Sequence, residues 1–178
     1  MARADALLAE TIDQLLPDEG GSSASRSPLD LARIGDLMLQ LAAFHRARSQ
    51  KPSPTVAATL EQVRAGLSAL AMGDGLPSPW HGGQPDRAQM ARLEVAPGET
   101  PPARRTGYVR LDAGTTRLVI DAGPPPPLRL CPTAHASTLA LTITDGARRL
   151  LVSCGAERGA DGLHGFPPEL AMGLRSTA

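Results

Sequence analysis

Four thiol and imidazole side chains in the second half of the chain are of types that bind metal ions: Cys131, His135, Cys154 and His164. Thiolate sulfur and imidazole nitrogen are common ligands of Zn²⁺. Three residues separate the first pair and nine separate the second, and neither spacing is that of a common zinc motif. We therefore expect two buried thiols rather than a zinc centre built from these four side chains. His135 remains a candidate metal ligand, with the alternative that it only hydrogen-bonds to backbone at the entrance of a strand.

A second group of side chains is of types that could bind a carboxylate or a sugar ring. Arg26 stands just before a predicted helix and could pair with a carboxylate, although a solvated arginine is the more common case. Trp80 and His81 precede two glycines, and an aromatic face beside glycines can stack on a sugar ring. The interpretation that we favour is that Trp80 fills a seam between helices and sheet. Tyr108 could act as a base, but a tyrosine that opens a strand more often lies in the core.

The first half of the chain is predicted to be helical. Apolar residues recur at helical spacing between residues 2 and 16. Ser27-Pro28 and Ser53-Pro54 each supply an N-cap serine followed by a proline at the first helical position, so helices are expected to begin there. Gly73 is expected to end the last of these helices, and one further helical turn is predicted over residues 88–93.

After residue 106 the apolar residues alternate, which is typical of strands. Residues 108–111 and 117–120 flank a predicted turn at residues 112–114, and the alternation over residues 139–144 leads into a second hairpin. Two hairpins predict an antiparallel sheet with one apolar face, which needs a second layer. The expected fold class is therefore α+β, with a helical segment over residues 1–92, a linker over 93–106 and the sheet over 107–178.

Charge and hydropathy limit the classes of partner. The chain has 18 basic and 18 acidic residues, so no overall field attracts nucleic acid. No apolar run approaches the ~20 residues of a membrane span. The first 16 residues carry acids within their apolar stretch and lack a small-residue cleavage site, so we expect no secretion signal.

An ordered series of segments resembles the heparinase II/III-type polysaccharide lyases: SRSP before a leucine-rich helix, GDG, WHGG, GYVRLDAGTTRLVIDAGPPPP, AHASTLALTITDG, RRLLVSCG and LRSTA. The resemblance covers nearly the whole chain. It implies the end of an incomplete (α/α) toroid followed by part of an antiparallel β-sandwich. It also implies an acidic polysaccharide as partner, β-elimination on uronate-containing chains as the reaction, and the cell envelope or periplasm as the location.

The chain departs from the family pattern at the positions that the family associates with catalysis and with zinc. The pattern H-x-H-x-D at the entrance of the sandwich falls on Thr133, His135 and Ser137, so the histidine associated with catalysis is replaced. His135 stands where the family has a histidine associated with a structural zinc. A further acid of the family falls on Ser153, and Ser22 stands where relatives have a histidine.

These departures set the functional expectations. A structural zinc takes about four ligands, so we expect no bound cofactor and assign His135 alone to the metal position. We expect no catalytic residue and a chain that is inactive by itself, because β-elimination needs both a base and a group that stabilises the developing charge. The alternative function is that of a non-catalytic carbohydrate-binding or structural protein. The candidate substrate-binding residues are Arg26, Trp80 and His81.

Overall fold

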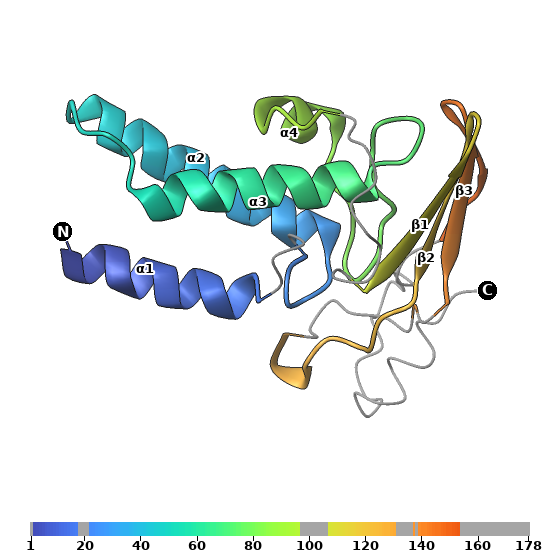
Figure 1. Ribbon diagram of the computed structural model, residues 1–178, viewed down its shortest axis with the longest axis horizontal. Helices are drawn as coiled ribbons and strands as arrows, with labels where there is room; N and C mark the ends of the chain where they lie inside the picture. Colours follow the sequence, from blue (N-terminus) through green and yellow to red (C-terminus); the bar gives the residue numbers. More distant parts are fainter. Residues whose placement is uncertain (1, 18–21, 97–106, 131–136, 138, 154–178) are drawn as a thin grey trace, which may run out of the picture.

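The computed structural model describes residues 2–17, 22–96, 107–130, 137 and 139–153. Four helices come first: α1 (Ala2–Leu15), α2 (Pro28–Ala47), α3 (Pro54–Leu70) and α4 (Arg87–Arg92). Four strands follow: β1 (Tyr108–Ala113), β2 (Thr116–Asp121), β3 (Leu141–Asp145) and β4 (Arg148–Leu151), with one 3₁₀ turn, Leu128–Leu130, between β2 and β3. The α+β class is therefore confirmed (Figure 1). The toroid, the sandwich and the domain boundaries remain predictions.

The helices begin where their capping residues predict. The Ser27 hydroxyl oxygen accepts a hydrogen bond from the Asp30 amide at 3.3 Å, and Ser53 accepts one from the Val56 amide at 3.4 Å. Each serine thereby satisfies an amide that has no partner within the helix. α3 ends at Leu70, three residues before the predicted stop at Gly73.

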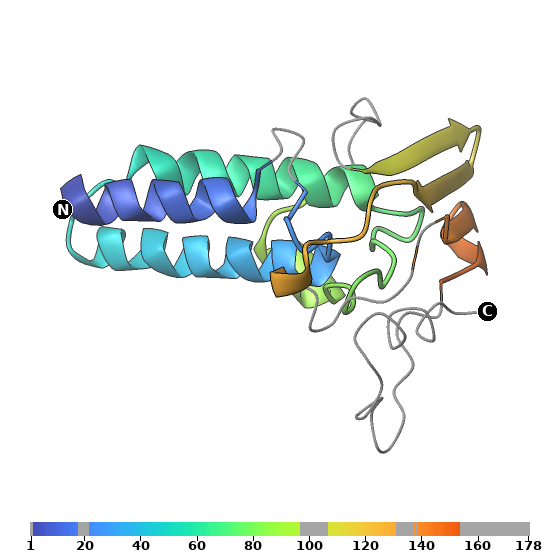
Figure 2. The same ribbon diagram turned by 90° about the horizontal axis from the view of Figure 1, so that it is seen from below.

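The three long helices share one apolar core. α2 and α3 pack against each other along their length, and α1 runs beside them in the direction opposite to α2 (Figures 1 and 2). The core is formed by buried side chains from all four helical segments, including Ile12, Leu16, Leu31, Met38, Val56, Val63, Leu67, Met90 and Leu93. Their spacing within each helix is the one that the sequence pattern indicates.

The strands form an antiparallel sheet in the order β1-β2-β3-β4. The first hairpin is tighter than predicted, because Ala113 pairs with Thr116 and leaves only Gly114 and Thr115 in the turn. The predicted turn at residues 112–114 is therefore corrected. Gly114 has a φ of 60°, and glycine adopts this left-handed conformation without steric cost, so a two-residue turn can close here.

The two faces of the sheet differ in chemistry. The face toward the helices is largely polar and includes the buried residues Tyr108, Arg110, Val119, Asp121, Thr142 and Thr144. The opposite face consists mostly of apolar side chains that are exposed or half-buried, among them Leu111, Leu118, Ile120, Leu141, Ile143 and Leu151. Helices and sheet are thus joined through polar contacts and one small apolar cluster around Trp80, while the larger apolar face points away from the helices.

Candidate functional site

Six side chains gather where the segment before α2 meets the sheet. We call this group the joint cluster: Arg26, Trp80, His81, Tyr108, Asp121 and Ser137. All six are buried. They come from the loop before α2, from the passage between α3 and α4, from β1, from the end of β2 and from the segment that precedes β3. The cluster therefore links parts of the chain that lie far apart in the sequence.

Arg26 connects the helical half to both ends of the first hairpin. Its guanidinium donates hydrogen bonds to the carbonyl oxygens of Pro124 at 2.6 Å and of Gly107 at 3.0 Å, and it forms an ion pair with Asp121. Two glycines make room for it. A Cβ at Gly123 would lie 2.7 Å from the guanidinium, and one at Gly107 would lie 3.0 Å from it. A larger residue at position 123 would therefore displace Arg26 from its three acceptors.

Asp121 is the charge at the centre of the cluster. Its second carboxylate oxygen accepts a hydrogen bond from the Ser137 hydroxyl and contacts His81 Nε2 at 2.9 Å. Burial alone would raise the pKa of Asp121, but the hydrogen bonds from His81 and Ser137 and the charge of Arg26 outweigh it and hold the pKa below its usual value. Asp121 is therefore ionised when the protein is folded at neutral pH.

The serine, histidine and aspartate do not form a nucleophilic triad. In such a triad the aspartate and the serine bind different nitrogens of the imidazole. Here the Ser137 hydroxyl lies 2.8 Å from His81 Nε2, which is the same nitrogen that contacts Asp121. The hydroxyl also bonds directly to the carboxylate. This geometry favours a closed polar network rather than an activated serine.

Trp80 and Tyr108 form the apolar wall of the cluster. Their rings stack with centroids 4.8 Å apart, and the Arg26 guanidinium lies 4.8 Å above the Tyr108 ring. The Tyr108 hydroxyl donates a hydrogen bond to the carbonyl oxygen of Arg26. Burial and the nearby charge of Asp121 raise the pKa of Tyr108 far above its usual value, so the phenol is a poor general base. Trp80 fills the seam between helices and sheet, as the structural interpretation of the sequence predicts.

Two residues of the cluster adopt a backbone conformation that favours glycine. Arg26 has a φ of 56° and His81 a φ of 47°. For residues other than glycine, such conformations cost about 1–3 kcal/mol and persist where surrounding contacts hold them. The hydrogen bonds of both side chains supply those contacts.

A belt of arginines extends the contact between the two halves. Arg110 and Arg117 of the sheet donate hydrogen bonds to the carbonyl oxygens of Ala69 and Ala71 at the end of α3, at 3.3 and 2.7 Å. The carbonyl end of a helix carries partial negative charge, so cations are favoured there. Asp112 pairs with both arginines, and their hydrogen bonds and charge keep the pKa of Asp112 below its usual value although burial opposes this.

The stability of the chain is expected to fall in acid. The pKa of Asp121 is lower in the folded protein than the value near 3.9 of an unfolded aspartate, so its stabilising contribution is complete above about pH 5 and is lost as the pH falls through the folded pKa. The pKa of Asp112 is shifted in the same direction. Urea unfolding at a series of pH values measures this loss. The Asp121→Asn variant should show a shallower decline below about pH 4, and an unchanged decline would contradict the assignment.

The structure places the three candidate substrate-binding residues together, in the joint cluster. Trp80 is fully buried, Arg26 is 8% exposed and His81 is 3% exposed. In this arrangement they bind other parts of the chain, and their role in substrate binding remains a prediction. Ser137, at the position of a family acid, also lies in the cluster. His135, Thr133, Cys131, Cys154 and His164 lie outside the described residues.

Sequence reasoning missed Asp121, the residue that joins the cluster. A signal was present, because Asp121 directly follows the predicted strand 117–120, and the structure places it on the same face of the sheet as Tyr108. Among the described residues there is no group of three or more histidine, cysteine or acidic side chains that could hold a metal ion. None of the helices in the described part of the chain has the length and hydropathy needed to cross a membrane.

Comparison with known proteins finds a family similarity for the second half of the chain. The model of the family "Heparinase II/III-like, C-terminal" matches residues 96–178. The second half of the chain is thus similar to this family. The heparinase II/III-like segment contains all four strands and supplies Tyr108, Asp121 and Ser137 to the joint cluster, whereas Arg26, Trp80 and His81 precede it. The suspected family is thereby confirmed.

A longer similarity extends beyond the heparinase II/III-like segment. FtsZ-localized protein C of Caulobacter vibrioides is 30% identical to this chain over 168 residues. The match covers 89% of this chain and 28% of that protein, so the chain spans less than a third of the length of its relative. No solved structure matches the chain.

Proposed function

We propose that this chain is a non-catalytic joining segment of a heparinase II/III-like polysaccharide lyase. The parent activity would be β-elimination on uronate-containing polysaccharides of the cell envelope. α1, α2 and α3 would be the last helices of an (α/α) toroid, and the four strands would be one layer of a β-sandwich. The exposed apolar face of the sheet supports this arrangement, because such a face needs a covering layer.

The observation that carries the proposal is the engagement of the candidate acid–base groups in the joint cluster. Elimination needs a base that reaches the sugar ring, together with a group that stabilises the negative charge of the intermediate. His81, Tyr108 and Asp121 are buried and bond to one another or to Arg26 and Ser137. In this position they stabilise the contact between helices and sheet.

Elimination assays on heparin, alginate and related uronans test the proposal. The purified 178-residue chain is expected to release no unsaturated uronate, followed by its ultraviolet absorbance. Sustained turnover that a His81→Ala or Tyr108→Phe variant abolishes would contradict the non-catalytic role.

Carbohydrate binding without catalysis is the second candidate function. A cavity of 290 Å³ beside the start of α2 favours it, since Ser23, Ser25 and Arg129 are among the residues that line the cavity. Arg33 and Asp30 line it as well and form an ion pair with each other. Hydroxyls and cations are the groups that recognise an acidic sugar. Calorimetric titration with the same glycans tests this role. Binding that Arg129→Ala weakens supports it, and the absence of binding would leave only the structural role.

A further inference from the structure

The buried charges of the described chain gather where the helices meet the sheet. Among the described residues, four arginine, histidine or aspartate side chains are buried: Arg26, His81, Arg110 and Asp121. Each of them bonds across the contact between the helical half and the strands. We call this contact the seam; it lies at the end of the long helices that faces the sheet (Figure 1). The core that the helices share among themselves is instead built from apolar side chains.

A second ion pair crosses the seam near the opposite end of the strands from Asp121. Asp74, in the loop after α3, accepts hydrogen bonds from Arg149 of β4 at 2.7 and 3.1 Å. The same guanidinium donates to the carbonyl oxygens of Leu76 and Pro77 at 3.0 and 3.2 Å. In this pair the sheet supplies the arginine, whereas in the joint cluster the sheet supplies the acid. We call the two pairs, Asp74 with Arg149 and Asp121 with Arg26, the seam clamps.

The carboxylates of both clamps are ionised in the folded protein at neutral pH. Burial alone would raise the pKa of Asp74, but hydrogen bonds and the charges of Arg149 and Arg87 outweigh it and keep the pKa below its usual value. The pKa of Asp121 is lowered by its partners in the joint cluster. A carboxylate of this kind stabilises the fold fully above the unfolded pKa of about 3.9, and its contribution is lost as the pH falls through the folded pKa. The charged or titratable groups that face the two carboxylates come from both sides of the seam: Arg87, Arg149, Arg26, His81 and Tyr108.

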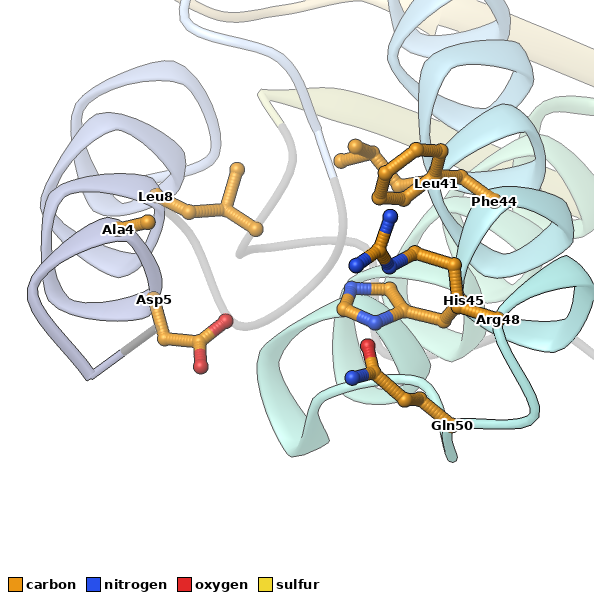
Figure 3. Close-up of a pocket in the computed structure, with 8 residues that line it drawn as sticks. All are labelled: Ala4, Asp5, Leu8, Leu41, Phe44, His45, Arg48 and Gln50. Carbon is orange, nitrogen blue, oxygen red and sulfur yellow. The ribbon is translucent and has the colours of Figure 1, made fainter.

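Away from the seam, the described helices carry their charges near the surface. Asp36 of α2 pairs with Arg92 of α4 at 3.1 Å, and the arginine side chain is 55% exposed. At the far end of the helices, Asp5 and Arg48 line an open pocket of 510 Å³ between α1 and α2 (Figure 3). Ion pairs that water reaches contribute little to stability, so protonation of these acids should change the stability of the helical core little.

We propose that in acid the sheet separates from the helices along the seam while the apolar core of the helices stays folded. Protonation of Asp74 and Asp121 leaves the arginine of each clamp desolvated and without its counter-ion, which is strongly destabilising. The small apolar cluster around Trp80 also crosses the seam and opposes separation, but its strength does not depend on these protons. Separation would free Arg26, Trp80 and His81, the three candidate substrate-binding residues, from their internal partners.

Fluorescence and circular dichroism of the full 178-residue chain follow the two halves separately. Trp80 is the sole tryptophan and is buried at the seam, so its emission reports separation, whereas the far-ultraviolet circular dichroism reports the helices. Below about pH 4 the emission is expected to shift to longer wavelength while most of the helical signal remains. Hydrogen exchange then identifies the part that opens: at about pH 3, amides of α2 and α3 should stay protected and amides of β1 and β2 should lose protection.

Asp74→Asn and Asp36→Asn form a matched pair of variants. The first removes the charge of one clamp, so the pH midpoint of the emission change should rise by at least about half a unit. The second removes the charge of an ion pair within the helical half and should leave the midpoint unchanged.

Three results would overturn the proposal. The first is loss of amide protection in α2 and α3 at the pH of the emission change, whether the helical signal disappears, as in complete acid unfolding, or remains, as in a molten globule. The second is native emission that persists down to about pH 2, well below the pKa of an unfolded aspartate. The third is an equal shift of the midpoint in the two variants, because the seam clamps would then not be its cause.

Discussion

The Asp121→Ala variant is expected to lose about 3–5 kcal/mol of its free energy of unfolding. Asp121 is completely buried and forms an ion pair with Arg26. It also contacts His81 Nε2 and accepts a hydrogen bond from the Ser137 hydroxyl. Removing one partner of a buried ion pair leaves the other charge desolvated and uncompensated, which costs more than the pair contributes when both partners are present. Chemical denaturation followed by circular dichroism measures the loss.

Asp13→Ala is the matched control for this variant. Asp13 is exposed on α1, and substitutions at such positions usually change stability by less than about 0.5 kcal/mol. A double variant, Arg26→Met with Asp121→Leu, should lose less than the sum of the two single variants, because it removes both charges. A loss below about 1 kcal/mol for Asp121→Ala would show that the joint cluster does not hold the two halves together.

Replacement of Trp80 by alanine is the second large expected effect, also about 3–5 kcal/mol. Trp80 is fully buried and packs with Tyr108 and with apolar side chains from the end of α3 and from β2: Leu70, Met72 and Val119. Truncation removes this contact and leaves a cavity that the rigid surroundings can fill only in part. Trp80→Phe, which keeps an aromatic ring against Tyr108, should lose less than Trp80→Ala.

Phe44 provides an aromatic control for Trp80. It is 58% exposed, so Phe44→Ala removes an aromatic ring with little loss of buried area. Circular dichroism is the appropriate probe, because Trp80 is the sole tryptophan and its fluorescence is lost in the variants. Equal losses for Trp80→Ala and Phe44→Ala would contradict the role of Trp80 as the plug of the seam.

The local elements were predictable because their signals are local. The capping serines at positions 27 and 53 lie three residues from the amides that they satisfy, and the sequence shows both partners together. The hairpins followed from alternation and turn residues in the same way. Their exact ends differed by one or two residues, since pairing across Gly114 depends on the backbone conformation of that glycine.

The joint cluster was predictable only in its parts. Arg26, Trp80 and His81 were chosen by residue type, and the structure brings all three together. Asp121 lies 95 residues from Arg26, and nothing in the sequence near either residue indicates their contact. The sequence also did not indicate which face of the sheet packs against the helices. Thr142 and Thr144 on that face are buried against polar partners such as Ser78 and the Gly73 amide rather than against an apolar core. The metal position of His135 remains a prediction.

The reach of Arg26 has a consequence for the order in which the chain folds. Its contact with Pro124 closes a loop of 98 residues, whereas the helix caps and hairpins close loops of a few residues. Long loops cost more entropy to close, so the joint should form after the helices and hairpins are in place. Interactions that form after the transition state act mainly on the rate of unfolding. The guanidinium of Arg26 would thus govern how long the two halves stay together rather than how quickly they meet.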